Sequence, residues 1–138
     1  QDYMPPNQDI ITALKQLYPD VQDIEWSQKG VYYVADCWVN GSELDVWFDA
    51  NANWIMTEME IFREQLPAAV NTAYEESGYG DWVIDNLTKL TFPHKSEEFV
   101  FEVQRGAQER ALYYSAYGGL LLEKDITDAD DTHWPDVE

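Results

Sequence analysis

The chain has few positive charges. Its 138 residues include 8 Lys and Arg against 27 Asp and Glu, which gives a formal net charge of −19 at pH 7. Such a surface repels the phosphate backbone of nucleic acids and the anionic head groups of lipids. We therefore expect a partner with a basic patch, and no nucleic acid. The charge alone would equally serve solubility.

Cysteine is almost absent, and long apolar runs are missing. Cys37 is the single cysteine, so an internal disulfide and a multi-thiolate metal site are both excluded. Cys37 lies inside a strand pattern, where a small buried hydrophobic residue is expected. No apolar run is long enough to cross a bilayer, so we expect no membrane insertion.

Histidine is scarce as well, and the usual catalytic motifs are missing. Of the two histidines, His94 lies in a Pro-containing loop and His133 near the C-terminus. Neither lies near a serine or cysteine in a recognisable nucleophile context, and the chain has no Gly-x-Ser-x-Gly motif and no phosphate-binding glycine-rich loop. The sequence therefore predicts a protein that is not an enzyme.

What the chain does contain is apolar and aromatic residues in a regular order. Hydrophobic residues make up 45% and aromatic residues 14% of the chain, enough for a folded core. Apolar residues at helical spacing predict a helix over about residues 7–18, which Pro19 ends. Four strand-like runs follow, separated by turn residues that include Asn40-Gly41, a strong hairpin signal: Ile24–Ser27, Val31–Val39, Leu44–Phe48 and Trp54–Ile61.

The second half repeats this order. A helix begins near Leu66-Pro67 and ends before Gly78. Four runs with strand patterns follow it: Trp82–Phe92, Phe99–Arg105, Gln108–Ala116 and Leu120–Ile126. The fold class is therefore predicted to be α+β, with tandem α-β-β-β-β repeats and an antiparallel sheet whose helices pack on one face.

Two stretches of the halves also align residue by residue. ALKQLYPD (Ala13–Asp20) matches AVNTAYEE (Ala69–Glu76), and WFDANANWI (Trp47–Ile55) matches YYSAYGGLL (Tyr113–Leu121). A duplication explains both matches and the shared element order. The predicted organisation is a lead over residues 1–6, a first repeat over 7–62, a second over 63–127 and an acidic, flexible tail over 128–138, all in one compact unit.

Alternation along the strands divides each strand into two faces. One face carries apolar residues such as Val31, Ala35, Cys37 and Val46, and we expect it to meet the helices. The other face alternates large aromatic residues with carboxylates. Aromatic residues on an open sheet face can simply stabilise cross-strand pairs, but Trp and Tyr are also enriched at interfaces. The predicted contact residues for a partner are Tyr32, Asp36, Trp38, Asp45, Trp47 and Tyr113.

One hairpin also carries oxygen ligands suited to calcium. Asp49, Asn51 and Asn53 follow a D-x-N-x-N spacing, which is typical of Ca²⁺ loops. Trp54 stands where an EF-hand needs glycine, and both flanks are strands. The alternative interpretation is a polar turn in which Asp and Asn supply side-chain hydrogen bonds. Calcium is the one cofactor that the sequence suggests.

The pattern resembles a known family, the PepSY-like, β-lactamase-inhibitor-protein-like (BLIP-like) domains exported by Bacteroidetes. The residues that carry the resemblance are LYPDV (Leu17–Val21), IEW (Ile24–Trp26) and GVYYVADCWVNGSELDVWFDANANWI (Gly30–Ile55), with a Gly-Gly hairpin at Gly118-Gly119. The resemblance implies a tandem α+β arrangement, a periplasmic location and an open sheet face that clasps another protein.

These observations together predict a function. We expect a non-enzymatic, exported module that binds a protein or peptide through its aromatic and acidic sheet face, in the manner of an inhibitor. The alternative is a calcium-binding or calcium-regulated periplasmic structural protein. The chain begins at Gln1, followed by a short polar, Pro-containing lead. This start fits a precursor whose export signal has been removed, and equally an expression boundary chosen at that point.

Overall fold

A computed structural model describes residues 5–129 and 132–135 of the chain. The predicted lead over residues 1–6 and the predicted tail over 128–138 therefore lie partly outside the described residues. The chain divides into two compact units. The first comprises the residues up to Met59 together with Phe92–His94, and the second comprises Glu60–Thr91 and the residues from Lys95 onward.

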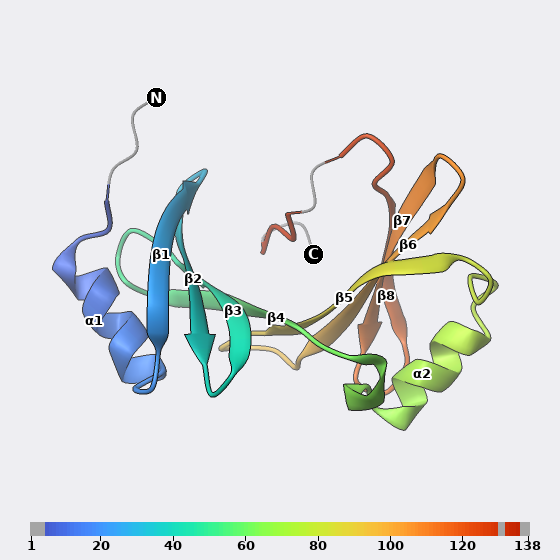
Figure 1. Cartoon of the computed structure of the whole chain (residues 1–138), viewed down its shortest axis with the longest axis horizontal. Helices are drawn as coiled ribbons and strands as arrows, with labels where there is room; N and C mark the ends of the chain where they lie inside the picture. The colour runs from blue at the N-terminus through green and yellow to red at the C-terminus, as the bar shows by residue number, and fades with distance from the viewer. Residues whose placement is uncertain (1–4, 130–131, 136–138) are drawn as a thin grey trace. The chain divides into compact units, whose positions relative to one another are not determined.

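The first unit consists of a helix followed by a four-stranded antiparallel meander (Figure 1). Asn7 caps the helix, because its side-chain oxygen accepts a hydrogen bond from the Ile10 amide at 3.1 Å. Asn40 and Gly41 both have positive φ values, 51° and 83°, as the predicted Asn-Gly hairpin requires. The elements are α1 (Gln8–Leu17), β1 (Gln22–Lys29), β2 (Tyr32–Val39), β3 (Ser42–Phe48) and β4 (Trp54–Glu60).

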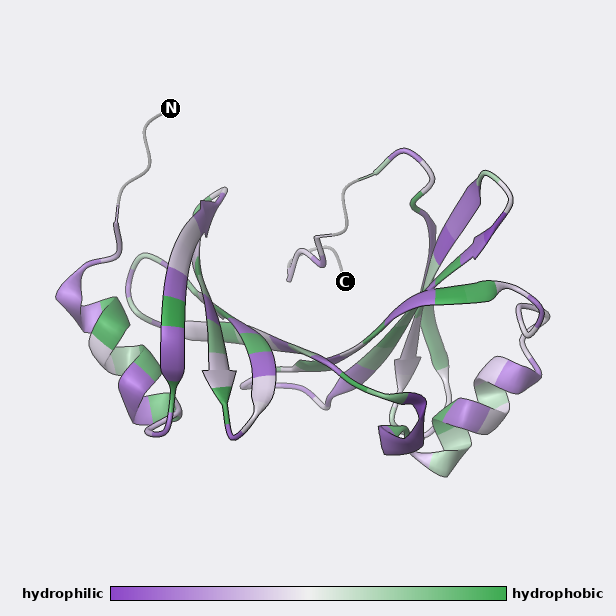
Figure 2. Ribbon diagram, in the orientation of Figure 1, coloured by the Kyte–Doolittle hydropathy of each residue, from purple (hydrophilic) through white to green (hydrophobic). Residues whose placement is uncertain are grey.

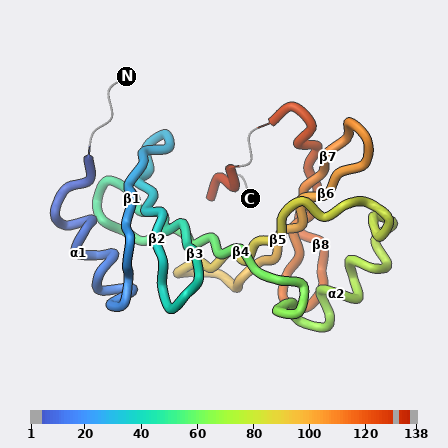
Figure 3. Tube along the Cα trace, viewed as in Figure 1, coloured from blue at the N-terminus to red at the C-terminus, as the bar shows by residue number. Residues whose placement is uncertain are grey.

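The second unit has the same element order, preceded by a short 3₁₀ helix. Pro67 stands at the N-terminal boundary of its α-helix, as the sequence predicts. The strands again pair antiparallel with their sequence neighbours, and the trace in Figure 3 follows these hairpins. The elements are η1 (Arg63–Gln65), α2 (Ala68–Glu75), β5 (Val83–Thr91), β6 (Glu98–Arg105), β7 (Gln108–Ser115) and β8 (Leu120–Asp125).

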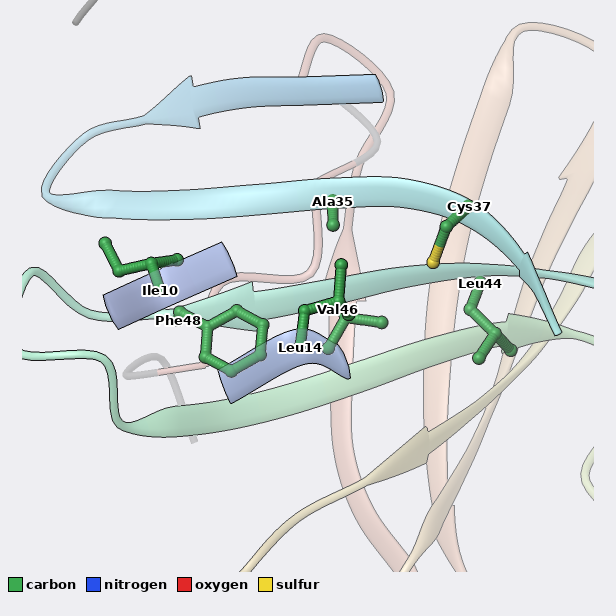
Figure 4. Packing of buried hydrophobic residues seen from close by; sticks show 7 residues of the cluster. All are labelled: Ile10, Leu14, Ala35, Cys37, Leu44, Val46 and Phe48. Carbon is green, nitrogen blue, oxygen red and sulfur yellow. The ribbon is translucent and has the colours of Figure 1, made fainter. Parts of the chain in front are cut away.

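In the first unit, one sheet face packs on α1. Figure 4 shows Ile10 and Leu14 of α1 beside side chains of β2 and β3. Cys37 is buried in this cluster, as predicted, and burial together with the nearby carboxylates of Asp36 and Asp45 raises the pKa of its thiol to about 11. The buried cluster comprises Ile10, Leu14, Ala35, Cys37, Leu44, Val46 and Phe48.

In the second unit, aromatic stacking joins α2 to the sheet. The ring of Tyr74 stacks on Phe101 with centroids 4.2 Å apart, and Phe101 meets Tyr114 edge-on at 5.6 Å. Such pairs contribute about 0.5–1.5 kcal/mol beyond their buried area. Figure 2 shows hydrophobic and hydrophilic residues interspersed along both helices. Each helix buries one side, which carries Ile10 and Leu14 in α1 and Val70 and Tyr74 in α2.

One residue of the predicted helix-facing side is placed differently. Val31 precedes β2, in the turn after Gly30, and its side chain is 73% exposed. Gly30 has a φ of 60°, so the chain reverses there, and the strand pattern begins one residue later, at Tyr32. The prediction that Val31 contributes to the core is wrong.

Candidate functional site

Four carboxylates form a row across the sheet of the first unit. Strand register places Glu25 opposite Asp36, Asp36 opposite Asp45, and Asp45 opposite Glu58, so the row crosses β1 to β4. Directly opposed residues of antiparallel strands project on the same face. This face is the one away from α1, because Cys37 and Val46, the chain neighbours of Asp36 and Asp45, lie in the core. We call these four residues the carboxylate row.

Electrostatic repulsion acts at the centre of the row, and Lys29 relieves it only in part. Burial raises the pKa of Asp45, and the Asp36 carboxylate raises it further, whereas Lys29 lowers it. Like charges directly opposite on a sheet are destabilising. A cationic group bound at this point would remove the repulsion, so the centre of the row is suited to receive a basic group.

Two of the predicted aromatic contact residues flank the row. Trp38, two residues from Asp36 on β2, has a side chain that is 43% exposed. Tyr32 lies at the other end of the strand, half-buried, with its ring edge-on to Trp47 at 5.6 Å. Tyr32, Asp36, Trp38 and Asp45 thus share one face of β2 and β3, as the alternation predicts.

Trp47 was predicted to contact a partner, but it is not exposed. Its side chain is fully buried, and its indole Nε1 donates a hydrogen bond to Glu58 Oε1 at 2.7 Å. Lys29 Nζ lies 5.5 Å from the centroid of the Trp47 ring, a cation–π distance. The expectation of an exposed Trp47 is wrong, because its neighbours close over the ring. Its observed contact positions Glu58, a member of the row.

Tyr113, in the second unit, is also buried. Its side chain is 2% exposed, and its hydroxyl lies 2.9 Å from Nδ1 of His133. His133 is itself 6% exposed and lies edge-on to the Tyr113 ring. The expectation of an open face at Tyr113 is wrong, because His133 packs against it. The interpretation of residues 128–138 as a solvated tail is wrong at His133 for the same reason.

The hairpin with the predicted calcium ligands uses them for its own turn. Asp49 Oδ1 accepts hydrogen bonds from the Asn51 and Asn53 amides, both at 2.9 Å, and Oδ2 accepts one from Asn53 Nδ2 at 3.0 Å. Partial desolvation raises the pKa of Asp49, but these hydrogen bonds outweigh it and lower the pKa. The described residues contain no group of three or more His, Cys, Asp or Glu arranged to hold a metal ion.

Sequence reasoning missed two members of the carboxylate row. Glu25 and Glu58 were not among the predicted contacts, because alternation assigns a residue to a face but gives no register between strands. The register of β1 on β2 shifts at an irregularity between Gln22 and Glu25, which the sequence pattern does not reveal.

Comparison with protein families gives a match over residues 31–122 to the family described as beta-lactamase-inhibitor-like, PepSY-like. The matched segment covers more than half of the chain. The chain belongs to this family.

Solved structures support the same assignment for this PepSY-like chain. A BLIP-like protein from Bacteroides fragilis is 55% identical, with a TM-score of 0.91 over 98% of this chain and 96% of the other. A candidate periplasmic protein from Bacteroides eggerthii is 30% identical, with a TM-score of 0.88 over 93% and 94%. A DUF2874 family protein from Bacteroides ovatus is 29% identical, with a TM-score of 0.88 over 93% of each chain. Curated proteins give no match.

The family description and the name of the Bacteroides fragilis protein are inhibitor-like, and the name of the Bacteroides eggerthii protein points to the periplasm. Within the described part of the PepSY-like chain, no helix is both long enough and apolar enough to cross a membrane.

Proposed function

We propose that the chain is an exported, non-enzymatic module that binds a protein or peptide carrying basic groups, through the sheet face of its first unit that carries the carboxylate row. The single observation that carries the proposal is the direct opposition of Asp36 and Asp45 within the carboxylate row, beside the exposed Trp38. The family name and the BLIP-like relative support a binding role rather than a catalytic one.

The energetics of the row favour a cationic partner. Each directly opposed pair of like charges destabilises a sheet by about 0.2–1 kcal/mol. A lysine or arginine placed over Asp36 and Asp45 would replace this repulsion with attraction and would be oriented by the carboxylates. Asp45 is half-buried, so such a contact is only partly screened by salt.

The aromatic residues supply the apolar part of the contact. Trp38 offers a large ring with few rotatable bonds, which makes it the expected anchor of the interface. Tyr32 extends the surface at the other end of β2. Trp47 contributes indirectly, because its indole donates a hydrogen bond to the Glu58 carboxylate at one end of the row. We therefore assign Trp47 a positioning role and not a direct contact.

The charge of the whole chain supports the choice of partner. A net charge of −19 attracts basic surfaces over long range and accelerates their encounter. Export to the periplasm is supported by the eggerthii relative, and cell fractionation of the native gene product tests it. An enzyme inhibited by the chain would be one such partner, in keeping with the family name.

The test is site-specific photo-crosslinking in the native host. A photoreactive phenylalanine replaces Trp38 in one variant and Tyr117 in a second; Tyr117 is an exposed aromatic residue of the second unit, at 90% exposure. We expect a discrete adduct from position 38 and none from position 117. The adduct should disappear when Asp36→Asn and Asp45→Asn are added, because the basic group then loses its carboxylates.

Calorimetry with the identified partner completes the test. Trp38→Ala should weaken binding about 30-fold, the effect of an anchor residue contributing about 2 kcal/mol. Equal adducts from both positions, or an adduct that persists without the two carboxylates, would contradict the proposal.

A further inference from the structure

The second unit contains a cavity of about 410 Å³ between its sheet and residues 132–134. Ala111 of β7 forms part of the floor, and His133 and Trp134 form part of the cover. This volume lies within the range that small-molecule sites occupy. The face involved is the one away from α2, because the neighbouring positions Phe101 and Tyr114 form the aromatic cluster of the core.

Strand register places opposite charges on two sides of this floor. Glu102 of β6 lies opposite Ala111, and Ala111 lies opposite Lys124 of β8. The three residues share one face, and with a strand spacing of about 4.8 Å the two outer backbones lie about 10 Å apart. The small side chain of Ala111 leaves space between an acidic wall and a basic wall.

Glu102 is the acidic wall, and it is almost fully buried. The residue is 7% exposed, and within the described residues its Oε2 has no hydrogen-bond partner. His133 Nε2 lies 2.9 Å from this oxygen, but the pair is a charge contact only when the imidazole is protonated and does not meet hydrogen-bond geometry. A carboxylate has about four lone-pair sites, so Glu102 can accept a hydrogen bond from a ligand in addition to the His133 contact.

Lys124 is the basic wall, and it retains donors. Its Nζ donates one hydrogen bond to the Tyr113 hydroxyl at 3.3 Å and lies 4.9 Å from the centroid of that ring. An ammonium carries three N–H donors, and contacts within the described residues use one of them, which leaves two for a ligand. Asp125, the other carboxylate that lines the cavity, is occupied by Thr127 and by Arg110 at 3.8 Å.

We propose that the cavity between Glu102 and Lys124 binds a small zwitterion, a free amino acid or dipeptide. The ligand's ammonium donates to Glu102 and its carboxylate accepts from Lys124, while the apolar body lies over Ala111 beneath Trp134. A simple anion would face the buried carboxylate of Glu102, and a simple cation would face the ammonium of Lys124. A ligand with both charges satisfies both walls.

The experiment uses the full chain, and free amino acids and dipeptides are titrated by two-dimensional NMR of the backbone amides and tryptophan indoles. Leucine and Leu-Leu are the first probes, compared with isopentylamine and 4-methylpentanoate, which keep the leucine skeleton but each lack one charged group. We expect saturable shifts near Trp134 with a zwitterion. The amine and the acid should bind at least about tenfold more weakly.

Variants then assign the two walls. Glu102→Gln and Lys124→Met should each weaken zwitterion binding about tenfold or more. Asp81→Asn, at an exposed carboxylate of the same unit, should leave binding unchanged. Circular dichroism checks that each variant is folded, and Lys124→Met on the less buried wall keeps the test informative if Glu102→Gln unfolds.

Three outcomes would overturn the proposal. The first is the absence of saturation by the common amino acids and by Leu-Leu up to about 50 mM, which would leave a cavity that holds only water. The second is equally tight binding of the amine or the acid alone. The third is zwitterion binding that survives both wall substitutions. A difference between leucine and Leu-Leu would distinguish a free amino acid from a peptide.

Discussion

At the scale of single residues, Asp36 and Asp45 are a pair of like charges that lowers the stability of the sheet in which they lie. The two side chains lie directly opposite on β2 and β3, and burial raises the pKa of Asp45, with Asp36 adding to the effect. Two carboxylates that only maintained solubility would do so equally well if they lay apart on the surface. The arrangement is therefore consistent with a site whose charge is neutralised by a partner.

The Asp45 carboxylate gives a prediction with a definite pH dependence. Because its pKa in the folded state lies above the unfolded value of 3.8, the stability that it contributes is present at low pH and is lost as pH rises through the folded pKa. Asp45→Asn should therefore raise the free energy of unfolding at pH 7, by about 0.2–1 kcal/mol. The gain should shrink toward pH 3, where the wild-type carboxyl is also neutral.

Asp20→Asn, at an exposed position, is the control. Urea unfolding at the two pH values measures both, and a gain independent of pH would contradict the argument.

Asp49 gives a second prediction at this scale. Its carboxylate accepts two backbone hydrogen bonds and one side-chain hydrogen bond, so Asp49→Ala should destabilise the chain by about 1–2 kcal/mol. Because N–H donors already occupy both oxygens, we expect the melting temperature to be the same in EDTA, in calcium and in magnesium. A rise specific to calcium that disappears in Asp49→Ala would instead support the calcium interpretation.

At the scale of elements, the last hairpins of the two units have the same pattern of hydrogen bonds. The Asp49 amide donates to the Asn53 carbonyl at 3.0 Å, and the Ser115 amide donates to the Gly119 carbonyl at 2.9 Å. The side-chain oxygens of Asp49 and Ser115 also accept from the amides of Asn53 and Gly119, respectively. Asp49 thus corresponds to a serine that has no charge, which favours a role in the turn. The likeness supports the predicted duplication, which stays a prediction.

Gly118 connects one of these hairpins to a helix. A Cβ atom on Gly118 would lie 2.7 Å from the Ala69 carbonyl oxygen of α2, and the residue has a φ of 88°. Gly118→Ala should therefore destabilise the chain through both strain and overlap. Gly106→Ala is a matched control, because Gly106 has a φ of 60° and open space around it. We expect Gly118→Ala to lower the free energy of unfolding, measured with denaturant, by about 1–3 kcal/mol more than Gly106→Ala does. Equal losses would mean that the backbone strain alone matters.

At the scale of the whole molecule, the dominant property is the net charge of −19. Repulsion among the carboxylates opposes compaction, and salt screens it: the Debye length falls from about 30 Å at 0.01 M to about 8 Å at 0.15 M ionic strength. We expect the melting temperature to rise over this range of sodium chloride. The rise should be smaller in Asp36→Asn/Asp45→Asn, which removes two of the charges. A melting temperature that does not change, or falls, would show that ion pairs outweigh the repulsion.

The local pattern of the sequence is enough to determine the elements of this protein. Helix caps, Asn40-Gly41 and strand alternation act over a few residues, so α1, the strands and the burial of Cys37 could be predicted from neighbours along the chain. The family could be identified in the same way, because its motifs are local as well.

Only the tertiary structure decided which residues form each site. The carboxylate row depends on strand register, which a one-residue slip would abolish and which alternation does not specify. Trp47 and Tyr113 were assigned to the correct strand faces, but side chains from distant segments bury them. His133 lies 20 residues from Tyr113 along the chain and 2.9 Å from its hydroxyl. A contact of this kind is made by folding, and no local pattern encodes it.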